Sequence, residues 1–241
     1  MISIIIQTKN IRTGFRKRIT DITFPIYKQL KNCEVIVSDF GSDDGTEEFV
    51  KDIGLKYVYT EPNEKQFLNM SKCLNNAIVN HAKHDIISPS GTDFIYPNNF
   101  GKAVESMYNN FNKNKFGYKY MMVTPREFDF DIDGYQLMER TNSFNYVFTK
   151  KMYYIVGGFD ERIYDWGGED VDIKKRFQEV IGEEKVCLKT PESMILLHIK
   201  HPQDFEKKCR NKIHKNNMKI VKENLDTKGQ NIVNSYYERE I

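Results

Sequence analysis

Two glycine pairs, a tryptophan and several carboxylates gather between residues 157 and 172. The segment reads Gly157-Gly158-Phe159-Asp160-Glu161, then Trp166-Gly167-Gly168-Glu169-Asp170-Val171-Asp172. Glycine pairs allow close approach of the backbone or positive φ angles. Carboxylates also favour a helix N-terminus, which explains Glu169 and Asp170 but not the Trp-Gly-Gly before them. An aromatic ring packs on the apolar face of a sugar while carboxylates accept hydrogen bonds from its hydroxyl groups, so the pattern indicates sugar recognition.

Three polar clusters follow predicted strands in the first half of the chain. They are Thr8-Lys9-Asn10, Asp39-Phe40-Gly41-Ser42 and Ser90-Gly91-Thr92-Asp93. Parallel strands bring such segments to one edge of a sheet, which is where open α/β folds bind ligands. Any single cluster fits a simple turn, whereas the three together indicate a nucleotide site. Neither GxGxxG after the first strand nor GxxxxGK[ST] is present, which argues against a dinucleotide-binding dehydrogenase and a P-loop enzyme.

A histidine at the end of the last predicted strand is a candidate metal ligand. It opens the sequence His198-Ile199-Lys200-His201. Imidazole nitrogen and aspartate oxygen both bind divalent cations, and Asp93 would meet His198 if both strands end at the same edge. Two such ligands make an incomplete site. On the residues alone, a hydrogen-bonded core histidine is the more common interpretation of His198.

The elements that must position these residues alternate between strands and helices in the first half. Short β-branched or apolar runs predict strands at 2–7, 34–38, 57–59 and 85–88, the last ended by Pro89. Helices are predicted at 15–30 with an interruption at Pro25, at 47–53 with Asp44 or Thr46 as the cap, and at 69–81. This alternation predicts an α/β fold with a doubly wound, mostly parallel sheet and helices on both faces.

The second half alternates less regularly. It predicts helices at 100–111, 150–156 and 169–181, strands at 121–124, 144–148 and 193–199, and an acidic loop or hairpin at 129–134. The chain after Pro202 is basic and predicted to be helical; residues 207–222 could lie on an acidic membrane surface or a partner, although a solvated helix is the preferred interpretation. We place a subdomain boundary near Pro97.

Composition is that of an ordinary globular protein. The 241 residues are 39% hydrophobic and 29% charged, with a formal net charge of +2. This excludes a disordered or collagen-like chain, and the charge balance argues against nucleic acid as a partner. The four cysteines lack the spacing of a zinc or redox motif. Since no apolar run is long enough for a signal peptide or a membrane span, we expect a cytoplasmic protein with free thiols.

Together these residues resemble a GT-A-fold glycosyltransferase, from Ser3 to about Pro202. The run Ile4-Ile5-Ile6-Gln7-Thr8-Lys9-Asn10 is similar to the first strand of family 2, I-I-I-P-T-Y-N, and Glu34 to Ser42 is similar to E-I-I-V-V-D-D-G-S, with Phe40 at the second aspartate. Trp-Gly-Gly-Glu-Asp-Val at 166–171 resembles the carboxyl-terminal motif of β-1,4-galactosyltransferases, polypeptide N-acetylgalactosaminyltransferases and bacterial chondroitin polymerases. Ser71-Lys72-Cys73-Leu74-Asn75 resembles the A-K-L-L-N stretch of the galactosyltransferases.

The metal motif departs from the family pattern. The D-x-D motif falls at Gly91-Thr92-Asp93, so the first aspartate is missing and Asp93 keeps the second. His198 matches the histidine of the Met-x-x-His pair of the galactosyltransferases, with Ile195 at the methionine position. The resemblance therefore implies Asp93 and His198 as ligands of Mn²⁺ or Mg²⁺, and it favours the metal interpretation of His198.

The resemblance also implies a role for each segment of the chain. Residues 1–97 would form the nucleotide-sugar-binding half of a GT-A domain, 98–201 the fused acceptor-binding and catalytic half, and 202–241 a helical extension. The implied nucleotide-binding residues are Thr8, Asn10, Asp39, Lys72 and Thr92. The implied acceptor-binding residues are Trp166, Gly167 and Gly168, with Glu169 orienting the acceptor and Asp170 acting as the general base.

The sequence thus predicts an inverting, metal-dependent glycosyltransferase of polysaccharide biosynthesis. It would transfer a hexose or N-acetylhexosamine of the galactose or glucose type from a UDP-sugar to a carbohydrate acceptor. A catalytically inactive GT-A-like module that binds a nucleotide or a partner protein is the alternative, because an aspartate is missing at Gly91. A sugar nucleotidyltransferase ranks third, since that class needs a Gly-rich basic loop and residues 8–14 hold only Lys9, Arg12 and one glycine.

Overall fold

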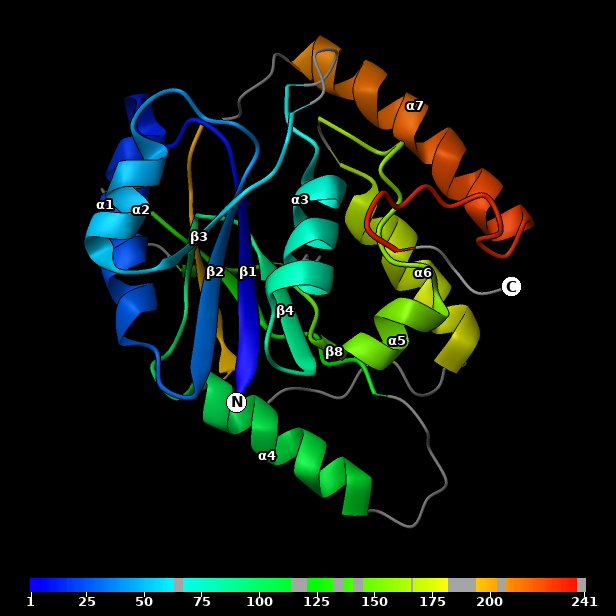
Figure 1. Ribbon diagram of the computed structural model, residues 1–241, viewed down its shortest axis with the longest axis horizontal. Coiled ribbons are helices and arrows are strands. Elements are labelled where there is room, and N and C mark those ends of the chain that lie inside the picture. Colours follow the sequence, from blue (N-terminus) through cyan, green and yellow to red (C-terminus); the bar gives the residue numbers. More distant parts are fainter. Residues whose placement is uncertain are drawn as a thin grey trace.

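A five-stranded sheet lies at the centre of the molecule (Figure 1). The computed structural model describes residues 1–62, 67–113, 121–131, 137–140, 145–165, 167–181, 194–202 and 207–237. The strands are β1 (Ile2–Thr8), β2 (Cys33–Asp39), β3 (Lys56–Tyr59), β4 (Ile86–Ser90) and β8 (Phe148–Thr149). They lie in the order β3-β2-β1-β4-β8, and all except the antiparallel β8 run parallel. The predicted α/β fold with a mostly parallel sheet is confirmed.

Helices cover both faces of this sheet. They are α1 (Gly14–Gln29), α2 (Thr46–Ile53), α3 (Met70–Asn76), the π-helical turn η1 (Ala77–His81), α4 (Phe100–Lys113), α5 (Lys150–Ile155), α6 (Glu169–Ile181) and α7 (Lys207–Asp226). Side chains of β1 alternate between the faces: Ile4 belongs to one core with Phe24 and Phe100, and Ile5 to the other with Leu74 and Phe177. Because both faces are buried, β1 needs an almost continuous apolar sequence.

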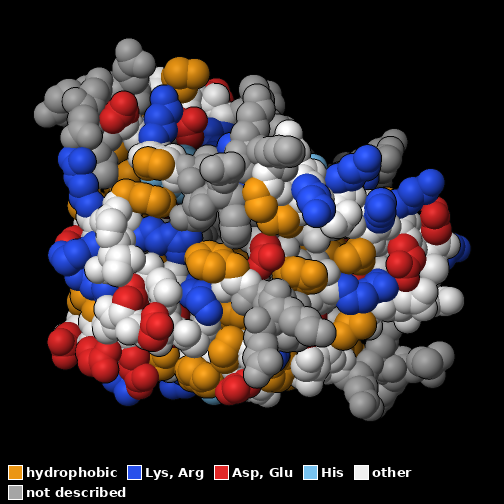
Figure 2. All heavy atoms as spheres, turned by 90° about the horizontal axis from the view of Figure 1, so that it is seen from above, with side chains coloured by type: hydrophobic (Ala, Val, Ile, Leu, Met, Phe, Trp, Pro, Cys, Tyr) orange, Lys and Arg blue, Asp and Glu red, His pale blue; other side chains and the backbone are white. Residues whose placement is uncertain are grey.

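A second, mixed sheet stands beside the carboxyl ends of the first. It has the order β5-β9-β6-β7 and consists of β5 (Phe94–Ile95), β9 (Leu196–Ile199), β6 (Glu127–Phe130) and β7 (Leu137–Glu139). Strands β9 and β6 are parallel, while β5 and β7 pair antiparallel to their neighbours. The helix α7 crosses the upper right of Figure 1. In the view from above in Figure 2, Lys and Arg side chains lie on that side of the molecule and also on the opposite side.

Two prolines interrupt their elements less than predicted. Helix α1 continues through Pro25. Pro25 and Asp21, whose carbonyl loses its helical partner to the proline, are both exposed, so water can satisfy that carbonyl. Strand β4 likewise runs through Pro89 to Ser90. Strand β8 pairs only with Ile86 and Ile87, so the edge of β4 is open where the proline lacks an N–H group.

Two local predictions were wrong. Residues 121–124 form no extended strand, because Val123 makes only an isolated antiparallel bridge to Val147. The cap of α2 is Gly45, with φ of 85° and no side-chain hydrogen bond. Asp44 and Thr46 instead accept hydrogen bonds from the backbone N–H groups of Arg12 and Ile11, at 2.6 and 3.3 Å. They tie α2 to the segment after β1.

The two halves of the chain share both sheets. Strand β8 pairs with β4 of the first half, and β5 of the first half pairs with β9 of the second; the division near residue 97 stays a prediction. Cys33, Cys73 and Cys209 are free thiols, and Cys187 lies outside the described residues. Among the helices that the structure describes, none combines the length and the apolar character needed to cross a bilayer.

Candidate active site

A cleft of about 400 Å³ opens where β1, β4 and β9 end. Thr8 at the end of β1 and Thr92, two residues after β4, line it, as do Glu169 and Asp170 at the start of α6. The register explains why these strand ends meet, since Thr8 pairs with Asp39 and Ile6 pairs with Ser90 in neighbouring parallel strands. The predicted convergence of polar segments at one sheet edge is thus present.

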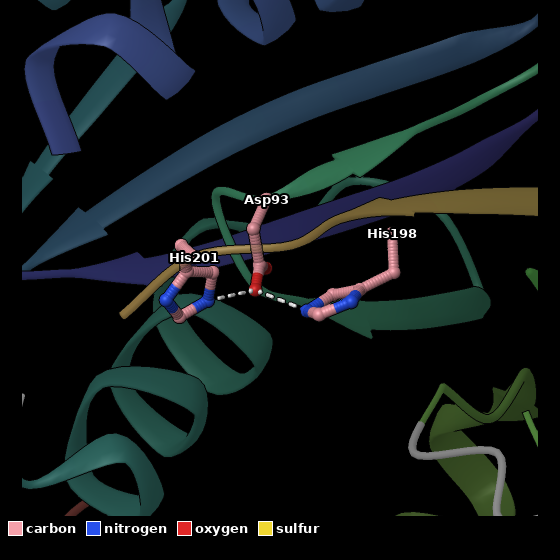
Figure 3. Close-up of side chains that lie close together, drawn as sticks. All are labelled: Asp93, His198 and His201. Atoms are coloured by element: carbon pink, nitrogen blue, oxygen red, sulfur yellow. Dashed lines mark hydrogen bonds and ion pairs between the residues drawn. The ribbon is translucent and has the colours of Figure 1, made fainter. Parts of the chain in front are cut away.

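Asp93, His198 and His201 form a metal-ligand cluster on one wall of this cleft (Figure 3). Asp93 Oδ2 lies 3.0 Å from His198 Nε2 and 3.0 Å from His201 Nε2. The antiparallel pairing of β5 with β9 sets Phe94 opposite His198, and the backbone N–H of Ile199 donates to the carbonyl of Asp93 at 2.8 Å. The predicted pair Asp93 and His198 is therefore brought together, and His201 joins it.

The charge of the cluster suits a cation. Burial acts to raise the pKa of Asp93, but the hydrogen bonds and positive charge of His198 and His201 outweigh it and hold that pKa well below its usual range. Asp93 is therefore ionised and faces two imidazole nitrogens. All three ligand atoms lie within 4.8 Å of one another. Two imidazoles and one carboxylate fit a divalent transition-metal ion and leave coordination positions open for substrate oxygens.

A second carboxylate orients His198. Asp129 Oδ1 lies 2.9 Å from His198 Nδ1, because the parallel pairing of β6 with β9 sets the two residues side by side. Asp129 can accept the Nδ1–H hydrogen bond, which leaves Nε2 directed at Asp93 and at a bound metal. Arg140 Nη1 lies 3.4 Å from the same oxygen of Asp129. The sequence placed Asp129 in an acidic loop or hairpin; only the strand register shows its relation to His198.

His201 was not predicted from the sequence as a ligand. Its ring stacks on Phe15 of α1, with 5.3 Å between the centroids and 10° between the planes. The glycine at position 91, where the family motif has an aspartate, has a steric explanation. A Cβ atom there would lie 2.4 Å from Asp93 Oδ1, so a side chain at 91 conflicts with the orientation of Asp93 that meets the histidines.

Glu169 and Asp170 begin α6 and line the same cleft. Burial raises the pKa of Glu169 well above its ordinary range, and the neighbouring Asp170 raises it further. Burial also raises the pKa of Asp170, while backbone N–H groups at the start of the helix act against that shift. A carboxylate with a raised pKa is a better proton acceptor than an exposed one, so this pair is equipped for acid–base chemistry.

The glycine loop, residues 157–168, leads into this pair and is held by side chains of α3. Asn75 Nδ2 donates to the carbonyl of Phe159 at 2.9 Å, and Asn69 Nδ2 donates to the carbonyl of Glu161 at 2.8 Å. Ser71 Oγ donates to the carbonyl of a third loop residue, Ile163, at 3.2 Å. The Ser71–Asn75 stretch therefore has a structural role, because it binds backbone carbonyl groups of Phe159 and Ile163, which belong to no strand.

The predicted nucleotide-binding residues are only partly gathered. Thr8 and Thr92 line the cleft, and Thr8 Oγ1 is buried without a hydrogen-bond partner among the described residues. Asn10, Asp39 and Lys72 are described but are not among the lining residues. Their roles stay predictions.

Each of the three residues away from the cleft lining has protein partners. Asp39 accepts hydrogen bonds from Ser42 and Tyr57, and burial raises its pKa. The side-chain oxygen Oδ1 of Asn10 accepts a hydrogen bond from the backbone N–H of Asp43 at 3.3 Å. Lys72 Nζ donates to the carbonyl of Glu61 at 2.9 Å. A nucleotide that uses these side chains must therefore compete with existing hydrogen bonds.

The predicted acceptor residues divide in a similar way. Gly167 lines the cleft, whereas Gly168 is buried and is not among the lining residues. Trp166 lies outside the described residues.

Comparisons with known proteins agree with this architecture. A family model described as the N-terminal domain of galactosyltransferase matches residues 126–202, which include the hairpin β6–β7, the glycine loop and β9. No curated protein matches the chain by sequence similarity.

Solved glycosyltransferases share the fold. A Pyrobaculum calidifontis mannosyltransferase in complex with GDP-Man and Mn²⁺ matches with a TM-score of 0.53 and 15% identity, over 84% of this chain and 57% of that one. TarS of S. aureus matches with a TM-score of 0.57 and 14% identity, over 88% and 42%. Glucosyl-3-phosphoglycerate synthase of Mycobacterium tuberculosis, in complex with Mn²⁺, UDP and phosphoglyceric acid, matches with a TM-score of 0.57 and 14% identity, over 97% and 80%.

These likenesses establish the fold. The chain spans 57% of the mannosyltransferase and 42% of TarS, which is less than two thirds of either. The predicted GT-A fold, a mostly parallel α/β sheet with helices on both faces, is confirmed by these neighbours.

Proposed function

We propose that this chain, which has the GT-A fold of glycosyltransferases, is an inverting glycosyltransferase of polysaccharide biosynthesis. It transfers a hexose or N-acetylhexosamine from a UDP-sugar to a hydroxyl group of a carbohydrate acceptor, with Mn²⁺ or Mg²⁺ as cofactor. The Mn²⁺ and nucleotide ligands of the structural neighbours support this choice of cofactor and donor class.

One observation carries the proposal. A single cleft is lined both by the metal-ligand cluster and by Glu169 and Asp170. Transfer from a nucleotide sugar develops negative charge on the leaving diphosphate, which needs positive charge nearby. The acceptor hydroxyl that attacks the anomeric carbon needs a base to take its proton. The cleft offers a ligand set for a cation and a pair of carboxylates, which meet these two needs.

Asp93, His198 and His201 would hold the cation. When bound, it supplies positive charge that stabilises the leaving diphosphate. Asp129 fixes the ring of His198 through Nδ1. Thr8 and Thr92, at the ends of the parallel strands, are placed to contact the nucleotide.

Asp170 is the general base. It accepts the proton of the acceptor hydroxyl while the hydroxyl oxygen forms a bond to C1 of the sugar and the bond from C1 to the diphosphate oxygen breaks. Attack from the side opposite the leaving group inverts the configuration at C1. Glu169 carries a proton over a wider pH range than an ordinary carboxylate, because burial raises its pKa, and it orients the acceptor by hydrogen bonds.

Thermal unfolding with UDP, with Mn²⁺ and with both tests the binding side of the proposal. A ligand at about 100 times its dissociation constant adds about 2.7 kcal/mol, which for this chain length raises the midpoint by roughly 5–10 °C. We expect the large rise only when both are present. A rise with UDP alone argues against a role of the cluster in nucleotide binding. No rise with UDP or GDP favours an inactive module over an enzyme.

Asp170→Asn tests the catalytic side. The variant should keep the thermal shift with UDP and Mn²⁺ and lose sugar transfer, measured as UDP release, by at least about 100-fold, the usual contribution of a general base. Glu179→Gln, on the exposed side of the same helix, is the matched control and should transfer normally. Normal transfer by Asp170→Asn would refute the base assignment.

A further inference from the structure

We propose that Asn217 on α7 is a positioning residue that holds the glycine loop in the shape required by the acceptor side of the cleft. The proposal rests on the proposed function, which assigns the loop and the start of α6 to the acceptor. Asn217 is buried and is not among the cleft-lining residues. It therefore acts through the loop and not by touching substrate.

One amide group holds the loop at two points. Asn217 Nδ2 donates to the carbonyl of Tyr164 at 3.0 Å and to the carbonyl of Gly167 at 2.7 Å. A side-chain amide has two N–H donors, so the bonds to Tyr164 and Gly167 use both. These carbonyls stand on either side of position 166 in the sequence, and the second precedes Glu169 by two residues. Their spacing fixes how the chain enters α6.

The second glycine pair lets the loop approach α7 this closely. A Cβ atom on Gly168 would lie 3.1 Å from Asn217 Cβ, and the φ of Gly168 is 111°, which side chains rarely tolerate. A Cβ atom on Gly167 would lie 3.4 Å from His214 Nδ1 of the same helix. The Gly-Gly pair before Glu169 therefore has a packing role against α7, in addition to any contact with substrate.

The helix that carries Asn217 is itself fixed to α6. Asn224 is fully buried, and its Nδ2 donates to Asp172 Oδ1 of α6 at 2.8 Å and to Asp160 Oδ2 of the loop at 3.0 Å. Arg162 Nη2 donates to Asn224 Oδ1 at 2.8 Å. Asn217 therefore reaches the loop from a helix that is already held to α6 by the hydrogen bonds of Asn224. Helix α7 lies beside α6 in Figure 1 and contacts it, although the family match ends at residue 202.

The test compares Asn217→Ala, Asn217→Asp and the exposed neighbour Asn216→Ala, which is the matched control. Asn217→Ala removes both hydrogen bonds to the loop. Asn217→Asp also sets a carboxylate against two carbonyl oxygens, so its defect should be larger. With p-nitrophenyl glycosides as acceptor probes, we expect kcat/KM for the acceptor to fall roughly tenfold or more in Asn217→Ala, further in Asn217→Asp, and not in Asn216→Ala.

Two readouts separate positioning from a general loss of structure. The thermal shift with UDP and Mn²⁺ and the slow release of UDP from a UDP-sugar without acceptor should stay at wild-type level in Asn217→Ala. Hydrogen exchange of the backbone amides of residues 167–170 should accelerate, while exchange in β1 and β4 stays unchanged. Unchanged exchange at 167–170, or a parallel loss of UDP binding and acceptor use, would overturn the proposal.

The same experiment distinguishes this inference from the proposed function. If wild-type protein transfers no sugar but Asn217→Ala accelerates exchange at 167–170 alone, the proposed activity fails and the positioning role of Asn217 stands. If wild type transfers sugar and Asn217→Ala matches it in kcat/KM, the activity stands and the positioning role fails.

Discussion

Gly91 occupies the position where a related metal motif has an aspartate, and its lack of a side chain matters for its neighbour. Asp93 turns its Oδ1 into the space that a Cβ at 91 would fill, while its Oδ2 meets both histidines. The missing aspartate and the additional histidine are therefore linked. Because position 91 has no side chain, Asp93 can take the orientation in which its Oδ2 meets both His198 and His201.

Replacement of Gly91 should weaken metal binding. In Gly91→Ala, relief of a 2.4 Å contact requires Asp93 to rotate away from the histidines, and we expect Mn²⁺ affinity in calorimetric titration to fall at least about tenfold, since loss of one ligand contact costs ~1–3 kcal/mol. Gly91→Asp, which restores the family motif, should be worse than Gly91→Ala.

Gly45→Ala is the control for that titration. Gly45 has a positive φ of 85° but only Glu48 Oε2 near its Cβ position, at 4.0 Å. It should therefore lose stability without losing Mn²⁺ affinity. Tighter Mn²⁺ binding by Gly91→Asp would contradict the steric argument.

Glu169 makes the stability of the protein dependent on pH. Its pKa in the folded state is raised above the unfolded value by burial and by Asp170. The folded state therefore keeps its proton more tightly, and the stabilising contribution of this group is complete below the unfolded pKa of about 4.3. It is lost as the pH rises through the folded pKa. Glu169→Gln places a neutral amide at this position, which does not titrate, so this pH dependence should disappear in the variant.

Denaturant unfolding at pH 5 and pH 9 measures this effect. We expect the free energy of unfolding of wild type, relative to Glu169→Gln, to be lower at pH 9 than at pH 5. Glu179→Gln, an exposed change on the same helix, should follow wild type at both pH values. Parallel pH profiles for wild type and Glu169→Gln would show that Glu169 titrates as an ordinary carboxylate.

At the scale of elements, α3 joins the two halves of the site. The predicted single helix at 69–81 is α3 followed by the π-helical turn η1, in which the N–H of Ala82 bonds to the carbonyl of Ala77 at 2.7 Å. One side of this unit packs Leu74 and Ile78 against the sheet, as the periodicity predicted. The other side presents amide and hydroxyl groups to the glycine loop.

Asn75 is the most connected of these groups and should be the most sensitive. Its side chain is fully buried and donates to Phe159 and Glu161 while accepting from Tyr153 and from the N–H of Phe159. Asn75→Ala should lower the free energy of unfolding by ~2–4 kcal/mol in urea titration, because several buried groups lose their partners. Asn80 is exposed, and its Nδ2 donates to Asn76 Oδ1 at 3.0 Å. The control Asn80→Ala should therefore cost less than ~1 kcal/mol.

At the scale of the whole molecule, α7 packs against α6 and binds the glycine loop. Val221 and Asn224 are fully buried, and Arg162 on the loop bonds to Asn224 and Glu223 of this helix. Removal of α7 would leave the buried carboxylates Asp160 and Asp172 without the amide of Asn224. Loss of a buried hydrogen-bond partner costs ~1–3 kcal/mol, and more when the group left behind is charged.

A chain that ends at residue 202 should therefore not fold as the full chain does. We expect loss of the cooperative unfolding transition, measured by circular dichroism during heating, although residues 1–202 include both sheets. Removal of residues 238–241 alone is the control and should leave the transition in place. A cooperative transition in the 1–202 chain would show that α7 is an addition to a self-sufficient domain.

The sequence by itself determined the elements and the chemistry of their ends. The apolar run at Ile4 to Ile6 specifies a strand buried on both faces, and Asp170 at the start of a periodic segment specifies a carboxylate at a helix N-terminus. These features depend on residues within a few positions of each other, which is where propensity and periodicity act.

Only the tertiary structure decided which residues complete the site. His201 reaches Asp93 across 108 positions, Asp129 reaches His198 across 69, and Asn217 reaches Gly167 across 50. No local pattern records such pairs, because they follow from the pairing of β5, β6 and β9 and from the docking of α7. The sequence states the chemistry of each side chain. Which of these side chains come together in the site depends on which strands pair and in which register.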